Sequence, residues 1–158
     1  MTHKDTTHSR EPKKTSRLQD ISEELESYGI KLDKPNTKPL MGESRLKRQQ
    51  TIHCEIPSVG AEFTFEMSDM DCIRIGRNDT RISDEPEIDL GDHGVASRGI
   101  SRRHAIICRE QSVLTVRDLK STNGTYLNGQ KLVPLESRVL RNGDELLIGY
   151  LEMKVHFD

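Results

Sequence analysis

From about residue 50 onward, apolar and polar residues alternate in short runs, and this period of two constrains the fold more than any other feature of the chain. Successive side chains of a β-strand point to opposite faces of the sheet, so the alternation predicts strands with one buried face. Asn-Gly pairs, which favour tight turns, separate several of the runs. The sequence therefore predicts an all-β sandwich or barrel. The alternating runs lie at residues 63–67, 73–75, 114–117 and 151–157, and the Asn-Gly pairs lie at residues 123–124, 128–129 and 142–143.

The first part of the chain has a different pattern. Residues 1–16 are polar and bury too little apolar surface to offset the entropy of ordering, so we expect them to be disordered. Residues 17–28 carry apolar side chains at helical spacing, and they are followed by Gly29, a residue typical of helix ends. This spacing predicts a short amphipathic helix over residues 17–28. Its apolar positions are Leu18, Ile21, Leu25 and Tyr28.

The boundary between this part and the β-rich part is marked by composition. Prolines and a glycine among many charged residues indicate a linker over residues 31–48. We therefore divide the chain into a disordered tail and linker with one short helix, over residues 1–47, and one folded domain over residues 48–158. A length of 158 residues fits a single domain with a tail.

The charge distribution argues against nucleic acid as a partner. Residues 1–50 hold 11 Lys and Arg against 8 Asp and Glu, and residues 51–158 hold 13 against 18, so the two parts carry +3 and −5. A nucleic-acid-binding domain usually presents a basic face or stripe, and the β-rich part is acidic overall. An anion must therefore be bound in a local pocket and not by the field of the whole domain.

Cysteine spacing and hydropathy restrict the remaining classes. Cys54, Cys72 and Cys108 form no Cys-x-x-Cys pair, so we expect buried, reduced thiols in a cytoplasmic protein and no metal site. With no Trp, three Phe and three Tyr, an aromatic-lined cofactor cavity is not expected, and no cofactor is predicted. No apolar segment has the character of a secretory signal or the length of about 18 residues that spans a membrane. We expect no membrane contact.

Three polar stretches stand at the ends of expected strands. They read IRIGRND at residues 73–79, SRRHA at residues 101–105 and DLKSTNGTYLNG at residues 118–129. Arginine, serine, threonine and asparagine side chains are the donors that hold an anion. Because binding residues of sandwiches are carried by the loops at one end, we expect the three stretches to meet.

Taken in order, I-x-I-G-R, S-R-R-H-A, D-x-x-S-T-N-G-T-Y-x-N-G and N-G-D-E-L-L-I-G resemble the motifs of a forkhead-associated (FHA) domain. The similarity covers roughly residues 48–158. It implies a β-sandwich of two packed sheets, preceded by the tail, that recognises phosphothreonine peptides in Ser/Thr kinase signalling and is not an enzyme.

The resemblance also implies roles for individual residues. Arg77 pairs with the phosphate, which suits a guanidinium because its donors form a fixed fork and its charge does not titrate away. Ser101 donates a hydroxyl hydrogen bond to another phosphate oxygen, and Arg102 faces the same anion. Thr122 lines the phosphate and the threonine methyl group, and Asn123 binds the peptide main chain.

The resemblance implies that three further residues support the binding loops. Gly76 lets the chain leave its strand, Gly124 occupies a tight turn, and His104 hydrogen-bonds beneath the loops. An alternative is an enzyme that uses Ser101 and His104 as nucleophile and base. No Gly-x-Ser-x-Gly elbow surrounds Ser101, so the sequence does not favour catalysis.

The tail suggests a form of regulation. Thr6 and Thr7 are candidate phosphoacceptors for a Ser/Thr protein kinase, and a flexible chain of about 45 residues spans about 35–40 Å, enough to reach the domain's own pocket. Some short bacterial FHA proteins have this layout. The ligand is therefore the phosphothreonine of a partner protein or the chain's own phosphorylated tail. The alternative function is a phosphate-independent scaffold that uses the sandwich face and the helix at residues 17–28.

Overall fold

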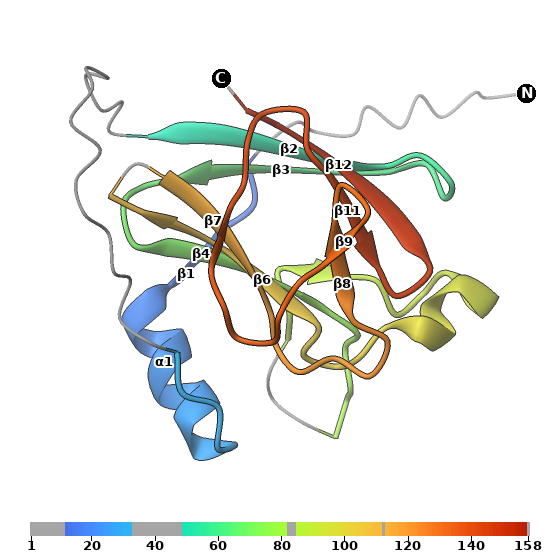
Figure 1. Cartoon of the computed structure of the whole chain (residues 1–158), viewed down its shortest axis with the longest axis horizontal. Helices are drawn as coiled ribbons and strands as arrows, with labels where there is room; N and C mark the ends of the chain where they lie inside the picture. The colour runs from blue at the N-terminus through green and yellow to red at the C-terminus, as the bar shows by residue number, and fades with distance from the viewer. Residues whose placement is uncertain (1–11, 33–48, 82–84, 112, 158) are drawn as a thin grey trace, which may run out of the picture.

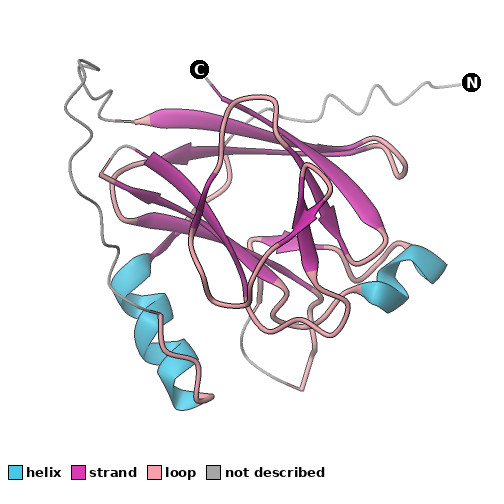
Figure 2. Ribbon diagram, viewed as in Figure 1, coloured by secondary structure: helices cyan, strands magenta, loops and turns pink. Residues whose placement is uncertain are grey.

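Two six-stranded sheets pack face to face in the computed structural model, which describes residues 12–32, 49–81, 85–111 and 113–157 (Figures 1 and 2). All pairings within the sheets are antiparallel except the short pairing of β5 with β4. The predicted all-β sandwich is thereby confirmed. The first sheet, called here the β2 sheet, has the order β3 (Ala61–Met67), β2 (Gln50–Ile56), β12 (Leu151–Phe157), β11 (Glu145–Ile148), β8 (Thr125–Leu127) and β9 (Gln130–Lys131).

The second sheet, called here the β6 sheet, carries the three polar stretches at its strand ends. Its order is β1 (Ser16–Arg17), β4 (Asp71–Gly76), β6 (Ala105–Glu110), β7 (Val113–Asp118) and β10 (Arg138–Val139), with β5 (Ile88–Asp89) beside β4. A 3₁₀ helix, η1 (Gly94–Gly99), precedes β6.

The core between the sheets follows the alternation of the sequence. In β12, the apolar residues are buried and alternate with exposed polar ones, because successive side chains point to opposite faces. The facing side chains of the β6 sheet are equally buried, so one continuous core joins the two sheets. Its members from these strands include Leu151, Met153 and Val155 of β12 and Ile73, Ile75, Ile107 and Val116 of the β6 sheet.

The outer face of the β6 sheet is covered by α1 (Leu18–Ser27), which lies against it in Figure 1. Leu18, Ile21 and Leu25 are buried and pack with side chains of β4, β6 and the segment after β7. This second apolar cluster explains why residues 105–108 are a continuous apolar run and do not alternate, since both faces of β6 are buried. The sheet side of the cluster consists of Cys72, Ile106, Cys108 and Leu119.

The structure differs from expectation at residues 12–16, which were expected to be disordered. Ser16 pairs with Cys72 in the β6 sheet, and the Lys13 amide donates to the Thr64 carbonyl at 2.9 Å. The polar side chains gave no sign of order because the pairing uses backbone groups, which the open edge of β4 offers to any extended segment. Residues 1–11 and 33–48, with Thr6 and Thr7, lie outside the described residues.

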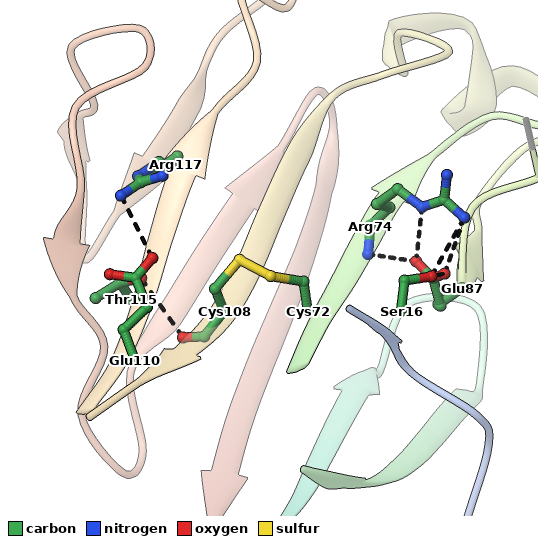
Figure 3. The surroundings of a disulfide bond; sticks show 8 residues. All are labelled: Ser16, Cys72, Arg74, Glu87, Cys108, Glu110, Thr115 and Arg117. Carbon is green, nitrogen blue, oxygen red and sulfur yellow. Dashed lines mark hydrogen bonds and ion pairs between the residues drawn. A yellow bond between two sulfur atoms is a disulfide. The ribbon is translucent and has the colours of Figure 1, made fainter. Parts of the chain in front are cut away.

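Ion pairs fix the same N-terminal segment to the sandwich. The Arg74 guanidinium lies 3.0 Å from the carboxylates of both Glu24 in α1 and Glu87 before β5. Ser16 also donates its hydroxyl hydrogen to Glu87, as Figure 3 shows. The described part of the N-terminal region is therefore packed on the sandwich and is not a separate unit.

A disulfide joins Cys72 of β4 to Cys108 of β6 (Figure 3). Both cysteines belong to the apolar cluster beneath α1. The expectation of three reduced thiols is therefore wrong for this pair. The two residues are 36 positions apart in the sequence, and only the antiparallel register of β4 and β6 places them opposite each other. Cys54 is a free, buried cysteine, and burial raises the pKa of its thiol to about 12. No helix among the described residues has the length and apolar character needed to cross a bilayer.

The disulfide predicts a redox-dependent stability. Replacing Cys72 and Cys108 by serine removes a cross-link that closes a 36-residue loop, so the free energy of unfolding should fall by about 3–4 kcal/mol. Urea unfolding of the wild type with and without reductant, beside the double variant, measures this. The double variant should be insensitive to reductant. A wild type that reductant does not destabilise contradicts the prediction.

Candidate functional site

The three polar stretches meet at one end of the sandwich around a surface pocket of about 550 Å³. β4 and β7 end there, and β6 begins there. The pocket brings together the five residues that the sequence predicted for phosphopeptide binding, from three separate loops. Arg77, Ser101, Arg102, Thr122 and Asn123 all line it.

Arg77 is placed by the backbone at the end of β4. A Cβ atom at Gly76 would lie 2.0 Å from the Arg102 carbonyl oxygen, so only glycine allows this approach of the two loops. The Arg77 amide donates to the Ser101 carbonyl at 3.1 Å, and its Nε donates to the Ile100 carbonyl at 3.3 Å. These bonds orient an exposed guanidinium at the pocket, with its two terminal nitrogens available for an anion.

The Ser101 side chain lines the pocket, where its hydroxyl can donate a hydrogen bond. Its oxygen accepts the Thr122 amide hydrogen at 3.0 Å, so the hydroxyl hydrogen is left for another acceptor. Asn123 donates its side-chain amide to the Gly99 carbonyl at 3.1 Å, which ties the turn after β7 to the loop before β6. These two bonds hold four pocket-lining residues in one arrangement.

His104 lies beneath these loops and is fully buried. Its Nδ1 accepts the Ser101 amide hydrogen at 3.1 Å, and its Nε2 donates to the Gly124 carbonyl at 2.9 Å. Both bonds are satisfied by the neutral ring protonated on Nε2. Burial lowers the pKa of His104, against the opposing effects of the Gly124 carbonyl and Asp118. The ring is therefore a neutral brace between two loops.

Arg102 carries a contact that the sequence did not predict. Its Nη1 lies 3.3 Å from the Asp79 carboxylate, which also receives two hydrogen bonds from the Arg81 side chain at 3.0 Å. Hydrogen bonds from Arg81 hold the pKa of Asp79 well below its usual range, so the carboxylate stays ionised. The charge of Arg102 is thus shared between Asp79 and the pocket.

One wall of the pocket comes from the end of α1, which the sequence assigned to the tail. Tyr28, Gly29 and Ile30 line it, together with Arg103. The Arg103 guanidinium carbon lies 3.6 Å from the centroid of the Tyr28 ring. Arg103 is not among the site residues predicted from the sequence. The one sequence feature that pointed to this wall was the position of Tyr28 at the end of the apolar stripe of the helix. That position does not show which residue the ring contacts.

The pocket is strongly cationic within an acidic domain. Its described lining contains no Asp or Glu and five basic side chains, which are Arg77, Arg98, Arg102, Arg103 and Lys120. Among the described residues, no three His, Cys, Asp or Glu side chains are grouped to hold a metal ion. The arrangement is suited to binding a multiply charged anion by hydrogen bonds and ion pairs.

Residues 73–149 match the family model described as FHA domain. A solved structure from a study of phosphothreonine-dependent FHA domain interactions superimposes with a TM-score of 0.52 and 26% identity, and the match covers 67% of this chain and 95% of that one. The matched family region contains all five pocket residues predicted from the sequence.

Two curated relatives are also similar over this region. The glycogen accumulation regulator GarA of Mycobacterium tuberculosis is 48% identical over 50 residues, which are 32% of this chain and 29% of that protein. The oxoglutarate dehydrogenase inhibitor of Corynebacterium diphtheriae is 36% identical over 93 residues, which are 59% of this chain and 54% of that protein. The alignments thus span 29% and 54% of these relatives' own lengths.

The buried ring of His104 predicts a pH-dependent stability. Because its pKa is lower in the folded state than the ordinary value of 6.5, the unfolded state binds more protons below that pH, and the free energy of unfolding falls as the pH decreases from about 6.5. His104→Gln keeps an amide donor and acceptor but does not titrate, so this part of the pH dependence should disappear.

Urea unfolding of both proteins between about pH 7.5 and pH 5 measures the difference. Using the difference between the two proteins cancels other titrating groups, including Glu110, whose pKa is raised by burial. Parallel curves for wild type and His104→Gln would show that the ring is not held neutral by the fold.

Proposed function

Since the chain belongs to the FHA domain family, we propose that its pocket recognises phosphothreonine in a segment of a partner protein within a Ser/Thr kinase pathway. The observation that carries the proposal is the convergence of Arg77, Ser101 and Asn123, from three loops, on one cationic pocket. A phosphate at neutral pH carries about −1.5 to −2 charges and three acceptor oxygens. Each charge-assisted bond from such a donor contributes about 1.5–3 kcal/mol.

The chemistry of the site favours binding and not catalysis. FHA domains are binding modules, and here the Ser101 and His104 side chains do not form a nucleophile–base pair. Both ring nitrogens of His104 bond to backbone groups, and the Ser101 oxygen accepts a backbone amide. A base must accept the hydroxyl hydrogen of its nucleophile, so this geometry supports the proposal that the protein is not an enzyme.

The alternative of a phosphate-independent scaffold used the sandwich face and the helix at residues 17–28. The apolar face of this helix is buried against the chain's own β6 sheet through Leu18, Ile21 and Leu25. It is therefore not available to a partner while α1 is docked. The pocket is the better supported interaction site.

Anchoring of the N-terminal segment on the sandwich shortens the part of the tail that can reach the chain's own pocket. Because Lys13 and Ser16 are paired to the sandwich, the free reach of Thr7 is that of the five residues before Pro12, at most about 18 Å. The longer reach of a wholly flexible tail no longer applies. We therefore propose a partner protein as the main source of the phosphothreonine. Phosphorylated Thr6 and Thr7 are a secondary, internal ligand that competes with the partner.

A cytoplasmic location is part of the same proposal, because the kinases and partners invoked act there. Such a compartment is reducing, so the Cys72–Cys108 bond has to resist small thiols while the protein is folded. Both sulfurs are buried under α1, which restricts attack by small thiols.

Arg77→Ala tests the proposal. The full-length wild type should bind a phosphothreonine peptide and not its unphosphorylated twin. The affinity of Arg77→Ala for the phosphopeptide should be lower by about 10- to 100-fold, because one charged partner of the phosphate is lost. Isothermal calorimetry measures both peptides. Arg141→Ala is the matched charge control. Arg141 is exposed in the segment before β11 and does not line the pocket, so this variant should bind as wild type. Equal binding of the two peptides refutes the proposal.

Regulation by the tail has its own test. Treatment with a Ser/Thr kinase should weaken binding of an added phosphopeptide, and a Thr6→Ala/Thr7→Ala variant should resist this effect. NMR titration follows the amides of Ser101, Thr122 and Asn123. If those amides do not move when the tail is phosphorylated, the tail is not an internal ligand.

A further inference from the structure

The Cys72–Cys108 disulfide lies between α1 and the sheet that the helix covers. Both residues belong to the apolar cluster on the outer face of the β6 sheet, and their exposed fractions are 0% and 1%. They stand directly opposite each other in the register of β4 and β6 (Figure 3). From α1, Leu18, Ile21 and Leu25 pack in the same cluster. The bond therefore forms part of the surface on which the helix is docked.

The third cysteine is separated from this pair. Cys54 lies in β2, and its side chain belongs to the core between the two sheets. The sulfurs of Cys72 and Cys108 lie on the other face of the β6 sheet, beneath α1. Exchange requires a thiolate in contact with the bond, and burial raises the pKa of the Cys54 thiol to about 12. The pair is therefore either joined or present as two thiols, without exchange with Cys54.

The apolar cluster supplies most of the energy that docks α1. The helix has ten residues, a length that is marginal without packing. Its N-cap residue, Arg17, makes no side-chain capping hydrogen bond. The ion pair between Glu24 and Arg74 is partly exposed, with 36% of the Glu24 side chain accessible, and such pairs stabilise a fold only weakly. A change within the cluster therefore has a large effect on the docking of the helix.

Reduction of the bond adds volume beneath the helix. Atoms joined by a covalent bond lie closer together than unbonded atoms, which keep about 3.5–4.0 Å between them. After reduction the two sulfurs must therefore separate, and each gains a hydrogen. Backbone hydrogen bonds hold β4 and β6 side by side, so the side chains move toward α1. Extra volume destabilises a closely packed cluster, and the docked helix is the part of this cluster that yields.

The docked helix in turn shields the bond. A thiolate attacks a disulfide sulfur directly, and both sulfurs are buried, so a reductant reaches them when α1 opens. Docking of the helix and integrity of the bond therefore stabilise each other, because coupling between two equilibria is reciprocal. Tyr28, Gly29 and Ile30 follow the helix directly and line the pocket. Release of α1 removes this wall from the pocket.

We propose that the Cys72–Cys108 bond is a redox latch, which keeps α1 docked and its end at the pocket while the bond is intact. A thiolate of a dithiol reductant bonds to one sulfur, and the other sulfur leaves as a thiolate and takes up a proton. The second thiol of the reductant then breaks the mixed disulfide. The protein gains two electrons and two protons, and the reductant becomes a disulfide. This inference goes beyond the proposed function and does not depend on it.

Limited proteolysis of the full-length protein with a glutamate-specific protease tests the latch. The protease cuts α1 at Glu23, Glu24 and Glu26 while the helix is open, so the cleavage rate reports the open population. Dithiothreitol should accelerate this cleavage by about 5- to 100-fold, the range expected from overpacking of a core. Cleavage at Glu110 in β6 should remain undetected. Alkylation in denaturant should find one free thiol before reduction and three after it.

Variants assign the response to this bond. Cleavage of Cys72→Ala/Cys108→Ala should be insensitive to dithiothreitol, and Cys54→Ala should respond as the wild type. Ile21→Ala removes apolar surface from the cluster and opens the helix, so its disulfide should be reduced roughly ten-fold faster. Gln19→Ala, at an exposed position of the same helix, is the matched control and should be reduced at the wild-type rate.

Three results would each overturn the latch. The first is an unchanged cleavage rate in α1 while alkylation shows all three thiols free. The second is the same reduction rate for Ile21→Ala and Gln19→Ala, because the helix then does not shield the bond. The third is cleavage at Glu110 that rises together with cleavage in α1, because reduction then unfolds the whole domain and does not release the helix alone.

Discussion

His104 makes four hydrogen bonds, and together they hold the ends of three strands at the distances that form the pocket. Its backbone amide donates to the Ile75 carbonyl at 3.0 Å, and its carbonyl accepts the Leu119 amide at 2.9 Å. Its ring bonds the backbones of Ser101 and Gly124. Because the ring is buried, loss of either ring bond leaves an unsatisfied polar group, which costs about 1–3 kcal/mol. The loops of the pocket are therefore held as one unit.

The helix α1 has two structural roles that depend on each other. Its apolar face covers the outer side of the β6 sheet, where Cys72, Ile106 and Cys108 need cover. Its end then brings Tyr28 to Arg103 at the pocket. A helix of this length is marginal on its own, so the packing that buries the sheet also orders the pocket wall.

The electrostatics of the molecule are local. The β-rich part is acidic overall, but its pocket presents five basic side chains and no acidic one among the described residues. Such an arrangement attracts an anion over short distances, since charges beyond about 10 Å are screened at ordinary ionic strength. In the proposed function, selectivity for a phosphorylated peptide then depends on the position of each donor. Net charge contributes little.

The sequence by itself determined the sandwich, because the alternation in runs such as residues 151–157 is a local property that any strand with one buried face must show. It also identified Arg77, Ser101, Thr122 and Asn123, since their motifs stand at strand ends in a characteristic order. How these residues act on a ligand stays a prediction, although the structure places them around one pocket.

Only the tertiary structure decided the features that depend on pairing between distant segments. The Cys72–Cys108 bond requires the register of β4 and β6, and the pairing of Ser16 with Cys72 uses backbone groups that composition does not reveal. The contact between Tyr28 and Arg103 requires α1 to dock in one direction along the sheet. Local patterns report which face of an element is buried, whereas the choice of partner is made by packing across the whole fold.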